Sequence, residues 1–113
     1  MAGQYCPKRG DVVWLTFSPQ AGHEQAGPRP ALVLSPEPYN RKVGLALLCP
    51  ITSQVKGYPF EVALPPEAKV KGVVLSDRMK SLDWRERGTR FCCTVTPETV
   101  KAVMNRLGTL LDL

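Results

Sequence analysis

The chain has 113 residues, of which 43% are hydrophobic and 22% charged, a composition typical of one soluble domain with a modest core. No stretch approaches the roughly 18 to 20 apolar residues of a membrane span, and the first ten residues lack the apolar run of a signal peptide, so a cytoplasmic protein with a single domain over residues 1–113 is expected. Fifteen Lys and Arg against ten Asp and Glu give a formal charge of +5, which favours polyanions or acidic partners.

The basic residues cluster in three segments, residues 69–71, 78–80 and 85–90. Each cluster is also compatible with a solvated turn or strand end. Together with the net charge they favour nucleic acid as a partner, because phosphates are attracted to such surfaces.

The four cysteines do not form a metal-binding pattern. Cys6, Cys49, Cys92 and Cys93 show no C-x-x-C spacing, and one histidine cannot complete a Cys/His zinc site, so we expect neither a metal nor another cofactor. Cys92 and Cys93 are expected to point to opposite faces of a strand, as free thiols.

The body of the chain has the pattern of a β-barrel. Residues 11–17 are rich in β-branched and aromatic residues and predict a strand, and a long irregular loop follows over residues 18–30. Further short strands are expected at residues 31–34, 43–49, 60–64, 72–75 and 90–95, separated by Gly, Pro, Asn and Ser.

A C-terminal amphipathic helix is predicted after Thr96-Pro97-Glu98, which supplies an N-cap, a proline at the first helical position and an early acid. An apolar stripe follows at helical spacing: Val100, Val103, Met104, Leu107, Leu110 and Leu111. We expect this stripe to pack on the barrel, with another subunit as the alternative.

Standard catalytic motifs are absent. The sequence has no P-loop, G-x-G-x-x-G, G-x-S-x-G or H-E-x-x-H, which removes support for nucleotide hydrolysis, dinucleotide chemistry, ester hydrolysis and zinc peptidase activity. Polar residues instead recur at the ends of predicted strands, in three groups: Glu24 and Arg29, Thr52-Ser53-Gln54, and Asp77-Arg78-Met79-Lys80. If these groups converge on one rim, they supply what is needed to hold single-stranded RNA.

RNA cleavage without a metal needs the substrate's own 2'-hydroxyl as nucleophile, a proton acceptor, and fixed positive charge for the phosphorane. Arg29 suits the last of these roles. Glu24 is favoured as the base, with His23 or an unusually perturbed Arg29 as alternatives. The plain alternative is that Arg29 is a surface residue before Pro30 and that the Thr52 hydroxyl only caps a turn.

The same segments resemble the MazF/PemK toxins, and their order and spacing also match. The resemblance rests on five segments spread from Gly10 into the final helix: Gly10 to Trp14, Glu24 to Ser35, Pro50 to Ser53, Tyr58 to Val62 and Ser76 to Arg85. It implies an SH3-like barrel with short helices and a C-terminal helix, which forms a homodimer and binds RNA across the dimer interface. It also implies a sequence-specific, ribosome-independent mRNA endoribonuclease, whose products carry a cyclic phosphate and a 5'-hydroxyl.

The resemblance also implies roles for individual residues. The catalytic residues would be Arg29, Thr52 and Glu24. The residues expected to contact RNA are His23, Gln25, Ser53, Gln54, Asp77, Arg78, Lys80, Trp84, Arg85 and Arg87. The implied partner is an antitoxin with an acidic, disordered C-terminal segment, which agrees with the net positive charge. Pro28 and Arg78 depart from the usual family pattern, so the cleaved sequence is not transferred.

Two other functions are compatible with the pattern. A toxin similar to the CcdB gyrase poisons would use the same barrel without RNA chemistry, and it would depend on the helix end at residues 110–113. An SH3-like adaptor would need an aromatic groove for proline-rich ligands, for which Trp14, Trp84 and three tyrosines are available but scattered.

Overall fold

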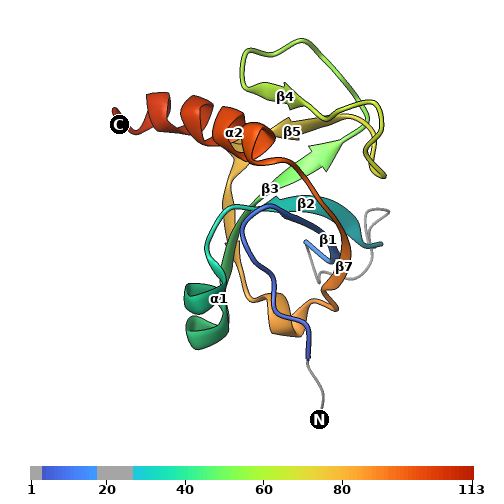
Figure 1. The fold of residues 1–113 in the computed structure, drawn as a ribbon, viewed down its shortest axis with the longest axis vertical. Helices are drawn as coiled ribbons and strands as arrows, with labels where there is room; N and C mark the ends of the chain where they lie inside the picture. Colours follow the sequence, from blue (N-terminus) through green and yellow to red (C-terminus); the bar gives the residue numbers. More distant parts are fainter. Residues whose placement is uncertain (1–3, 18–26) are drawn as a thin grey trace.

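The computed structural model describes residues 4–17 and 27–113. Its strands are β1 (Asp11–Leu15), β2 (Arg29–Val33), β3 (Ala46–Thr52), β4 (Glu61–Ala63), β5 (Val73–Leu75), β6 (Lys80–Leu82) and β7 (Arg90–Thr94). The helices are α1 (Glu37–Val43) and α2 (Pro97–Leu110), and two single 3-10 turns, η1 (Ser76–Arg78) and η2 (Trp84–Glu86), flank β6. Figure 1 shows the strands wrapped into a curled sheet with α2 lying beside β5 at one end.

The sheet is antiparallel throughout, with the strand order β4-β5-β3-β2-β1-β7 and with β6 pairing to β3. The long strand β3 organises it, because β2 pairs along one edge while β6 and β5 share the other edge, at the start and the end of β3. The expectation of a mainly β, SH3-like fold with a C-terminal helix is confirmed. Among the described strands, β4 and β7 end the path without pairing to each other, so the sheet is curled but not a closed ring.

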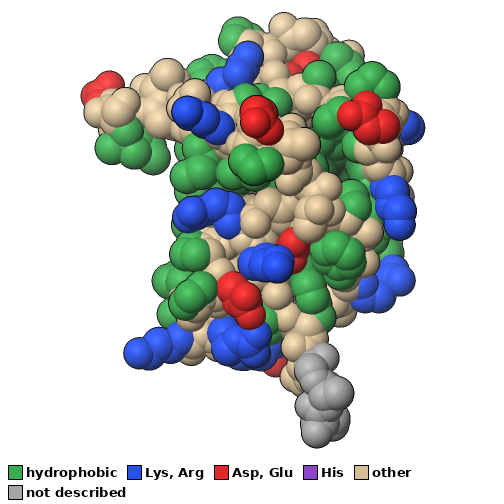
Figure 2. Space-filling model, in the orientation of Figure 1, with side chains coloured by type: hydrophobic (Ala, Val, Ile, Leu, Met, Phe, Trp, Pro, Cys, Tyr) green, Lys and Arg blue, Asp and Glu red, His purple; other side chains and the backbone are tan. Residues whose placement is uncertain are grey.

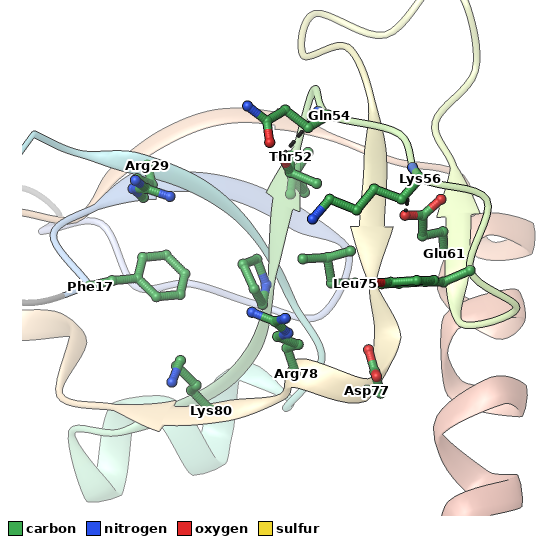
Figure 3. Close-up of a pocket in the computed structure, with 13 residues that line it drawn as sticks. Phe17, Arg29, Thr52, Gln54, Lys56, Glu61, Leu75, Asp77, Arg78 and Lys80 are labelled. Atoms are coloured by element: carbon green, nitrogen blue, oxygen red, sulfur yellow. Dashed lines mark hydrogen bonds between the residues drawn. The ribbon is translucent and has the colours of Figure 1, made fainter. Parts of the chain in front are cut away.

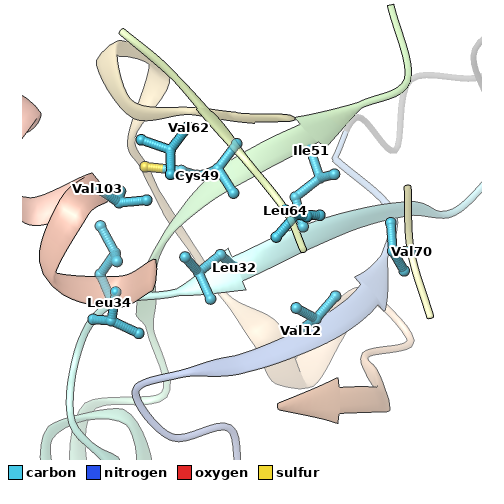
Figure 4. Packing of buried hydrophobic residues seen from close by; sticks show 11 residues of the cluster. Val12, Leu32, Leu34, Cys49, Ile51, Val62, Leu64, Val70 and Val103 are labelled. Carbon is cyan, nitrogen blue, oxygen red and sulfur yellow. The ribbon is translucent and has the colours of Figure 1, made fainter. Parts of the chain in front are cut away.

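Strand alternation divides the core between the two faces of this sheet. On one face, Leu32, Cys49 and Ile51 pack with Val12 and the buried side of α2, as Figure 4 shows. On the other face lies a second apolar cluster, which comprises Cys6, Val13, Leu15, Ala31, Val33, Ala46, Leu48, Leu82 and Trp84. The second face is the one that leads to the candidate site.

The segment between β2 and β3 is the main departure from the expected strands. A strand was expected over residues 43–49, but α1 ends at Val43 and β3 begins at Ala46. Pro38 is compatible with the first turn of a helix, and Gly44 ends it in the left-handed conformation, with φ of 80° and its N–H donated to the Asn40 carbonyl. The buried Asn40 side chain then ties α1 to the N-terminal segment by donating to the Pro7 carbonyl.

The prediction that Cys92 and Cys93 point to opposite faces is wrong. The pairing of β7 with β1 shifts between Val12, which pairs with Cys93, and Val13, which pairs with Phe91. Cys92 is therefore the extra residue of a β-bulge, which interrupts the alternation. Both cysteines pack against the first core cluster, and all four cysteines are free thiols.

Helix α2 packs on the sheet through its first half. Thr96 caps it as expected, since its side chain accepts a hydrogen bond from the Thr99 N–H, and Val100 and Val103 are buried. Leu107 is half-buried against the first core cluster, whereas Met104, Leu110 and Leu111 are exposed. The end of α2 projects from the sheet in Figure 1, and Figure 2 shows hydrophobic side chains on it. No described helix has the length and apolar character needed to cross a membrane.

Candidate active site

On the second face of the sheet, the side chains change from apolar to polar near the start of β2 and the end of β3. Ala31 pairs with Pro50, and the same antiparallel register continued by two residues sets Arg29 opposite Thr52. Residues two apart share a face, so Arg29 continues the face of the buried Ala31, and Thr52 continues that of the buried Leu48 and of Pro50. Two polar side chains thus follow the apolar core at the ends of adjacent strands.

These residues lie in an open groove of about 540 Å³, shown in Figure 3. Its walls come from the end of β1, the start of β2, the end of β3, the loop after β3, and the segment from β5 to β6. The residues that line it are Phe17, Arg29, Pro50, Ile51, Thr52, Gln54, Lys56, Tyr58, Glu61, Leu75, Asp77, Arg78 and Lys80. Segments distant in sequence therefore converge on one surface.

The groove is cationic. Its lining contains four cations, Arg29, Lys56, Arg78 and Lys80, against two carboxylates, Glu61 and Asp77. All four cationic side chains are exposed, so they remain available to an anionic ligand. Both carboxylate oxygens of Glu61 accept hydrogen bonds from the backbone N–H groups of Lys56 and Gly57.

Thr52 has a structural role as well as a position in the groove. Its hydroxyl oxygen accepts a hydrogen bond from the Gln54 N–H at 3.1 Å, which fixes the turn after β3. A hydroxyl that accepts one bond still has a proton to donate. The capping of a turn and a donor role toward a ligand are therefore compatible in this residue.

The structure brings together six of the residues predicted from sequence: Arg29, Thr52, Gln54, Asp77, Arg78 and Lys80 all line the groove. Ser53 is exposed next to Thr52 but does not line it. The predicted base Glu24 and the predicted RNA contacts His23 and Gln25 lie outside the described residues.

Three predicted RNA contacts are placed elsewhere and serve the fold. Trp84 is buried in the second core cluster and donates its indole N–H to the Asn40 carbonyl. Arg85 lies over the Trp84 ring, 4.7 Å from its centroid, and donates to the Arg41 carbonyl. The Trp84 indole N–H and one Arg85 N–H thus have protein acceptors, which sequence spacing does not reveal.

Arg87 is half-buried and acts on the backbone near the groove. Its guanidinium forms an ion pair with Asp83 and donates to the carbonyl oxygens of Thr16 and Phe17. This arrangement holds the end of the first strand segment, whose residue Phe17 lines the groove. The geometry therefore supports a positioning role for Arg87 and gives no support to direct contact with RNA.

Seven of the lining residues were not predicted as site residues from the sequence: Phe17, Pro50, Ile51, Lys56, Tyr58, Glu61 and Leu75. Lys56 and Tyr58 belong to the connection between β3 and β4, and Glu61 is the first residue of β4. The available signal was the polar, Gly- and Pro-containing character of this connection, which follows directly on Thr52.

Among residues 4–17 and 27–113, no group of three or more His, Cys, Asp or Glu side chains is placed to hold a metal ion. Burial raises the pKa of the Cys49 thiol to about 12, and burial also raises the pKa of Cys93, to about 11. Neutral thiols of this kind are poor nucleophiles and poor metal ligands. The described lining of the groove offers cations, hydroxyls and carboxylates.

A curled antiparallel sheet with an open, cationic and partly aromatic groove at its strand ends defines a class of small β proteins that bind a flexible polyanion such as single-stranded nucleic acid. The chain belongs to the PemK-like, MazF-like toxins of type II toxin-antitoxin systems, whose family model matches residues 8–111.

Known proteins support this assignment along nearly the full length. The endoribonuclease toxin MazF of Escherichia coli K12 is 46% identical over 111 residues, which cover 98% of this chain and 99% of that protein. The endoribonuclease toxin ChpB of Escherichia coli K12 is 36% identical over 110 residues, 93% of this chain and 94% of the relative.

Solved structures give the same result. The crystal structure of MazF from Deinococcus radiodurans superposes with a TM-score of 0.89 at 52% identity, covering 97% of this chain and 100% of that one. A structure of MazE-MazF from Deinococcus radiodurans has a TM-score of 0.90 at 50% identity and covers 96% of this chain and 99% of the other.

Proposed function

We propose that the chain, an endoribonuclease toxin of its family, cleaves single-stranded mRNA at specific sequences in the groove around Arg29, without a metal ion and without the ribosome. The observation that carries the proposal is the convergence of Arg29 and Thr52 at the ends of adjacent strands in a cationic groove. A flexible single strand fits such an open groove, where cations hold phosphates and the rings of Phe17 and Tyr58 offer surfaces for bases.

In the proposed reaction, the 2'-hydroxyl oxygen of the substrate attacks the adjacent phosphorus and the bond to the 5'-oxygen of the next nucleotide breaks. The products are a 2',3'-cyclic phosphate and a 5'-hydroxyl. Arg29 stabilises the extra negative charge of the phosphorane, and the Thr52 hydroxyl donates a hydrogen bond to a phosphate oxygen. Glu24 is proposed to accept the 2'-hydroxyl proton, with His23 as the alternative, and the departing 5'-oxygen takes a proton from water.

The remaining groove residues are proposed to bind RNA. Arg78 and Lys80 contact phosphates, while the Gln54 amide and the Asp77 carboxylate have the donors and acceptors to read base edges. For Ser53 and Gln25, the proposed contacts with RNA rest only on the resemblance to the MazF/PemK toxins.

We propose that the toxin acts in the cytoplasm as a homodimer, with residues 1–113 forming one toxin domain and a cognate antitoxin as inhibitor. Structures of relatives contain MazE together with MazF, which supports an antitoxin partner. The formal charge of +5 and the cationic groove favour an antitoxin segment that is acidic. Such a segment would compete with RNA for the same surface.

The test is incubation of the purified protein with a long single-stranded RNA in excess EDTA, followed by mapping of the ends. We expect discrete cuts, each with a cyclic phosphate and a 5'-hydroxyl, and no cut where the nucleotide before the scissile bond is 2'-deoxy. Intact RNA, or cleavage that EDTA abolishes and magnesium restores, would contradict the proposal. A gyrase poison without RNA chemistry would leave every RNA intact.

A further inference from the structure

The connection between β3 and β4, residues 53–60, forms one wall of the groove. Hydrogen bonds hold it at its start, in its middle and at its end. At its start, the Thr52 hydroxyl accepts the Gln54 N–H. In its middle, the two carboxylate oxygens of Glu61 accept the N–H groups of Lys56 at 3.1 Å and Gly57 at 2.9 Å. These bonds define the path of the loop before any ligand binds.

The other side of the loop is fastened to helix α2. Arg106 donates from Nε to the Pro59 carbonyl at 2.8 Å, and the Phe60 carbonyl accepts the N–H of Ser76. Gly57 adopts φ of 84°, a conformation that a residue with a Cβ rarely takes, so the tight turn needs this glycine. An exposed loop with this many fixed points is preorganised, which lowers the entropy cost of binding.

The preorganised loop presents Lys56 to the groove. Figure 3 shows its side chain extending into the groove from the side opposite Arg29, between Gln54 and Arg78. Within the part of the chain that the structure describes, the Lys56 ammonium forms no ion pair and no hydrogen bond. A long cationic side chain held over an open groove and given no internal partner is suited to an external anion.

We propose that Lys56 binds an RNA phosphate next to the scissile phosphate and that Glu61 is the positioning residue that sets the loop so that Lys56 reaches it. The inference rests on the proposed function, since it assigns a second phosphate site in the same groove. Glu61 carries no direct contact with RNA in this arrangement. Its carboxylate acts through the backbone of Lys56 and Gly57.

The arrangement predicts coupling between the two residues. Lys56→Ala removes the ammonium, and Glu61→Ala releases the loop that carries it, so each is expected to raise KM roughly tenfold or more, the effect of one charge-assisted hydrogen bond. The value of kcat should stay within about twofold, because a flanking phosphate is bound equally in the ground state and the transition state. The double variant should be no worse than Lys56→Ala alone.

The experiment measures kcat and KM on one short RNA for wild type, both single variants and the double variant. Lys42→Ala and Glu67→Ala are the matched controls, because each removes one exposed charge outside the groove. Thermal unfolding checks that Glu61→Ala is folded, and Glu61→Gln, whose amide keeps one acceptor oxygen, should lie between wild type and Glu61→Ala.

A KM for Lys56→Ala within twofold of the control would overturn the phosphate site. Additive effects of the two substitutions would overturn the positioning role, since a merely structural Glu61 would weaken the enzyme with or without Lys56. If the wild type leaves RNA intact, the proposed function fails. Binding of the same RNA at several salt concentrations then still tests Lys56, whose removal should lower the salt slope by about 0.7.

Discussion

At Thr52 one hydroxyl group is used by the fold and by the proposed chemistry. The oxygen accepts the Gln54 N–H that fixes the turn after β3, while its proton is directed to the ligand in the proposed mechanism. Both contributions require a hydroxyl on Cβ, and neither requires the methyl group. Substitutions that remove or keep the whole hydroxyl group therefore test the assignment.

Thr52→Val keeps the shape of the side chain and removes the donor, and we expect it to lower kcat by about 10- to 100-fold. Thr52→Ser retains the hydroxyl and should keep kcat within a few-fold of wild type. Steady-state cleavage of a short RNA measures both. Equal losses in the two variants would show that the hydroxyl is not what the reaction needs.

Asp11 has a purely structural role away from the groove. It is 1% exposed, and one of its oxygens accepts hydrogen bonds from the Tyr5 hydroxyl at 2.5 Å and from the Lys8 N–H at 3.2 Å. Burial, followed by the hydrogen bond to Asp11, raises the pKa of Tyr5 strongly, so the phenol stays protonated as a donor.

Tyr5→Phe should lower the free energy of unfolding by about 1 to 3 kcal/mol, because the buried carboxylate loses its side-chain donor. Urea denaturation measures the change, with Tyr39→Phe as a control at an exposed position on α1. A stability equal to that of the control variant would mean that the Tyr5 hydroxyl is not an effective partner for Asp11.

At the scale of elements, η2 is tied to the end of the first strand segment by Asp83 and Arg87. The hydrogen bond from Arg87 lowers the pKa of Asp83, so the native state favours the ionised carboxylate. The stabilisation is present above the carboxyl pKa of the unfolded chain. It is lost as the pH falls through the lowered pKa of the folded state.

Asp83→Asn should therefore weaken the fall in the free energy of unfolding as the pH is lowered into the acid range. Near neutral pH, the substitution should change the slope of stability against pH less. Denaturant midpoints measured from pH 7 down to pH 3 check this, with Glu86→Gln as a control in the same turn. If the wild-type and variant curves run parallel across this range, the ion pair between Asp83 and Arg87 does not contribute to the pH dependence of stability.

Strand alternation and helix capping were sufficient to predict most elements. The apolar and β-branched residues of β1 and β2 and the Thr96 cap of α2 are local signals, and the structure follows them. Helix α1 was missed because it has only seven residues, lies between Pro36 and Gly44 and contains Pro38, and because its buried residue is the polar Asn40. The bulge at Cys92 was missed because it arises from the pairing of two strands.

The convergence of the site residues could be predicted from the sequence for those that lie at the ends of strands. Arg29 and Thr52 end neighbouring strands, so their convergence follows from alternation and antiparallel pairing. The structural contacts of Trp84 and Arg85 could not be predicted, because their acceptors, the carbonyls of Asn40 and Arg41, lie in a helix distant in sequence. Lys56 was missed because only the folded loop shows that it faces the groove.

For the whole molecule, the distribution of charge matters more than the net charge of +5. The groove cations are exposed, whereas Arg85 and Arg87 lie outside the groove lining and donate to protein carbonyls. Only cations that reach phosphates release counterions when RNA binds, so individual arginines and lysines should contribute unequally to the salt dependence of binding.

We expect the affinity for an uncleavable RNA, 2'-deoxy at the cut position, to fall as salt rises. Lys80→Ala should reduce the slope of log affinity against log salt by about 0.7, the value for one phosphate contact on a single strand. Arg85→Ala should leave the slope unchanged. Fluorescence anisotropy at several salt concentrations measures both slopes, and the reverse ranking would contradict the placement of these two residues.

The central claim is that Arg29 supplies fixed positive charge to the scissile phosphate in a reaction that uses no metal. The most direct measurement is kcat/KM for cleavage of one short RNA in excess EDTA by wild type, Arg29→Ala and the charge-matched control Lys42→Ala. We expect unchanged cleavage by the control and a loss of about 100-fold or more for Arg29→Ala, as for removal of a transition-state donor. An Arg29→Ala protein that is folded and cleaves within tenfold of wild type would contradict it.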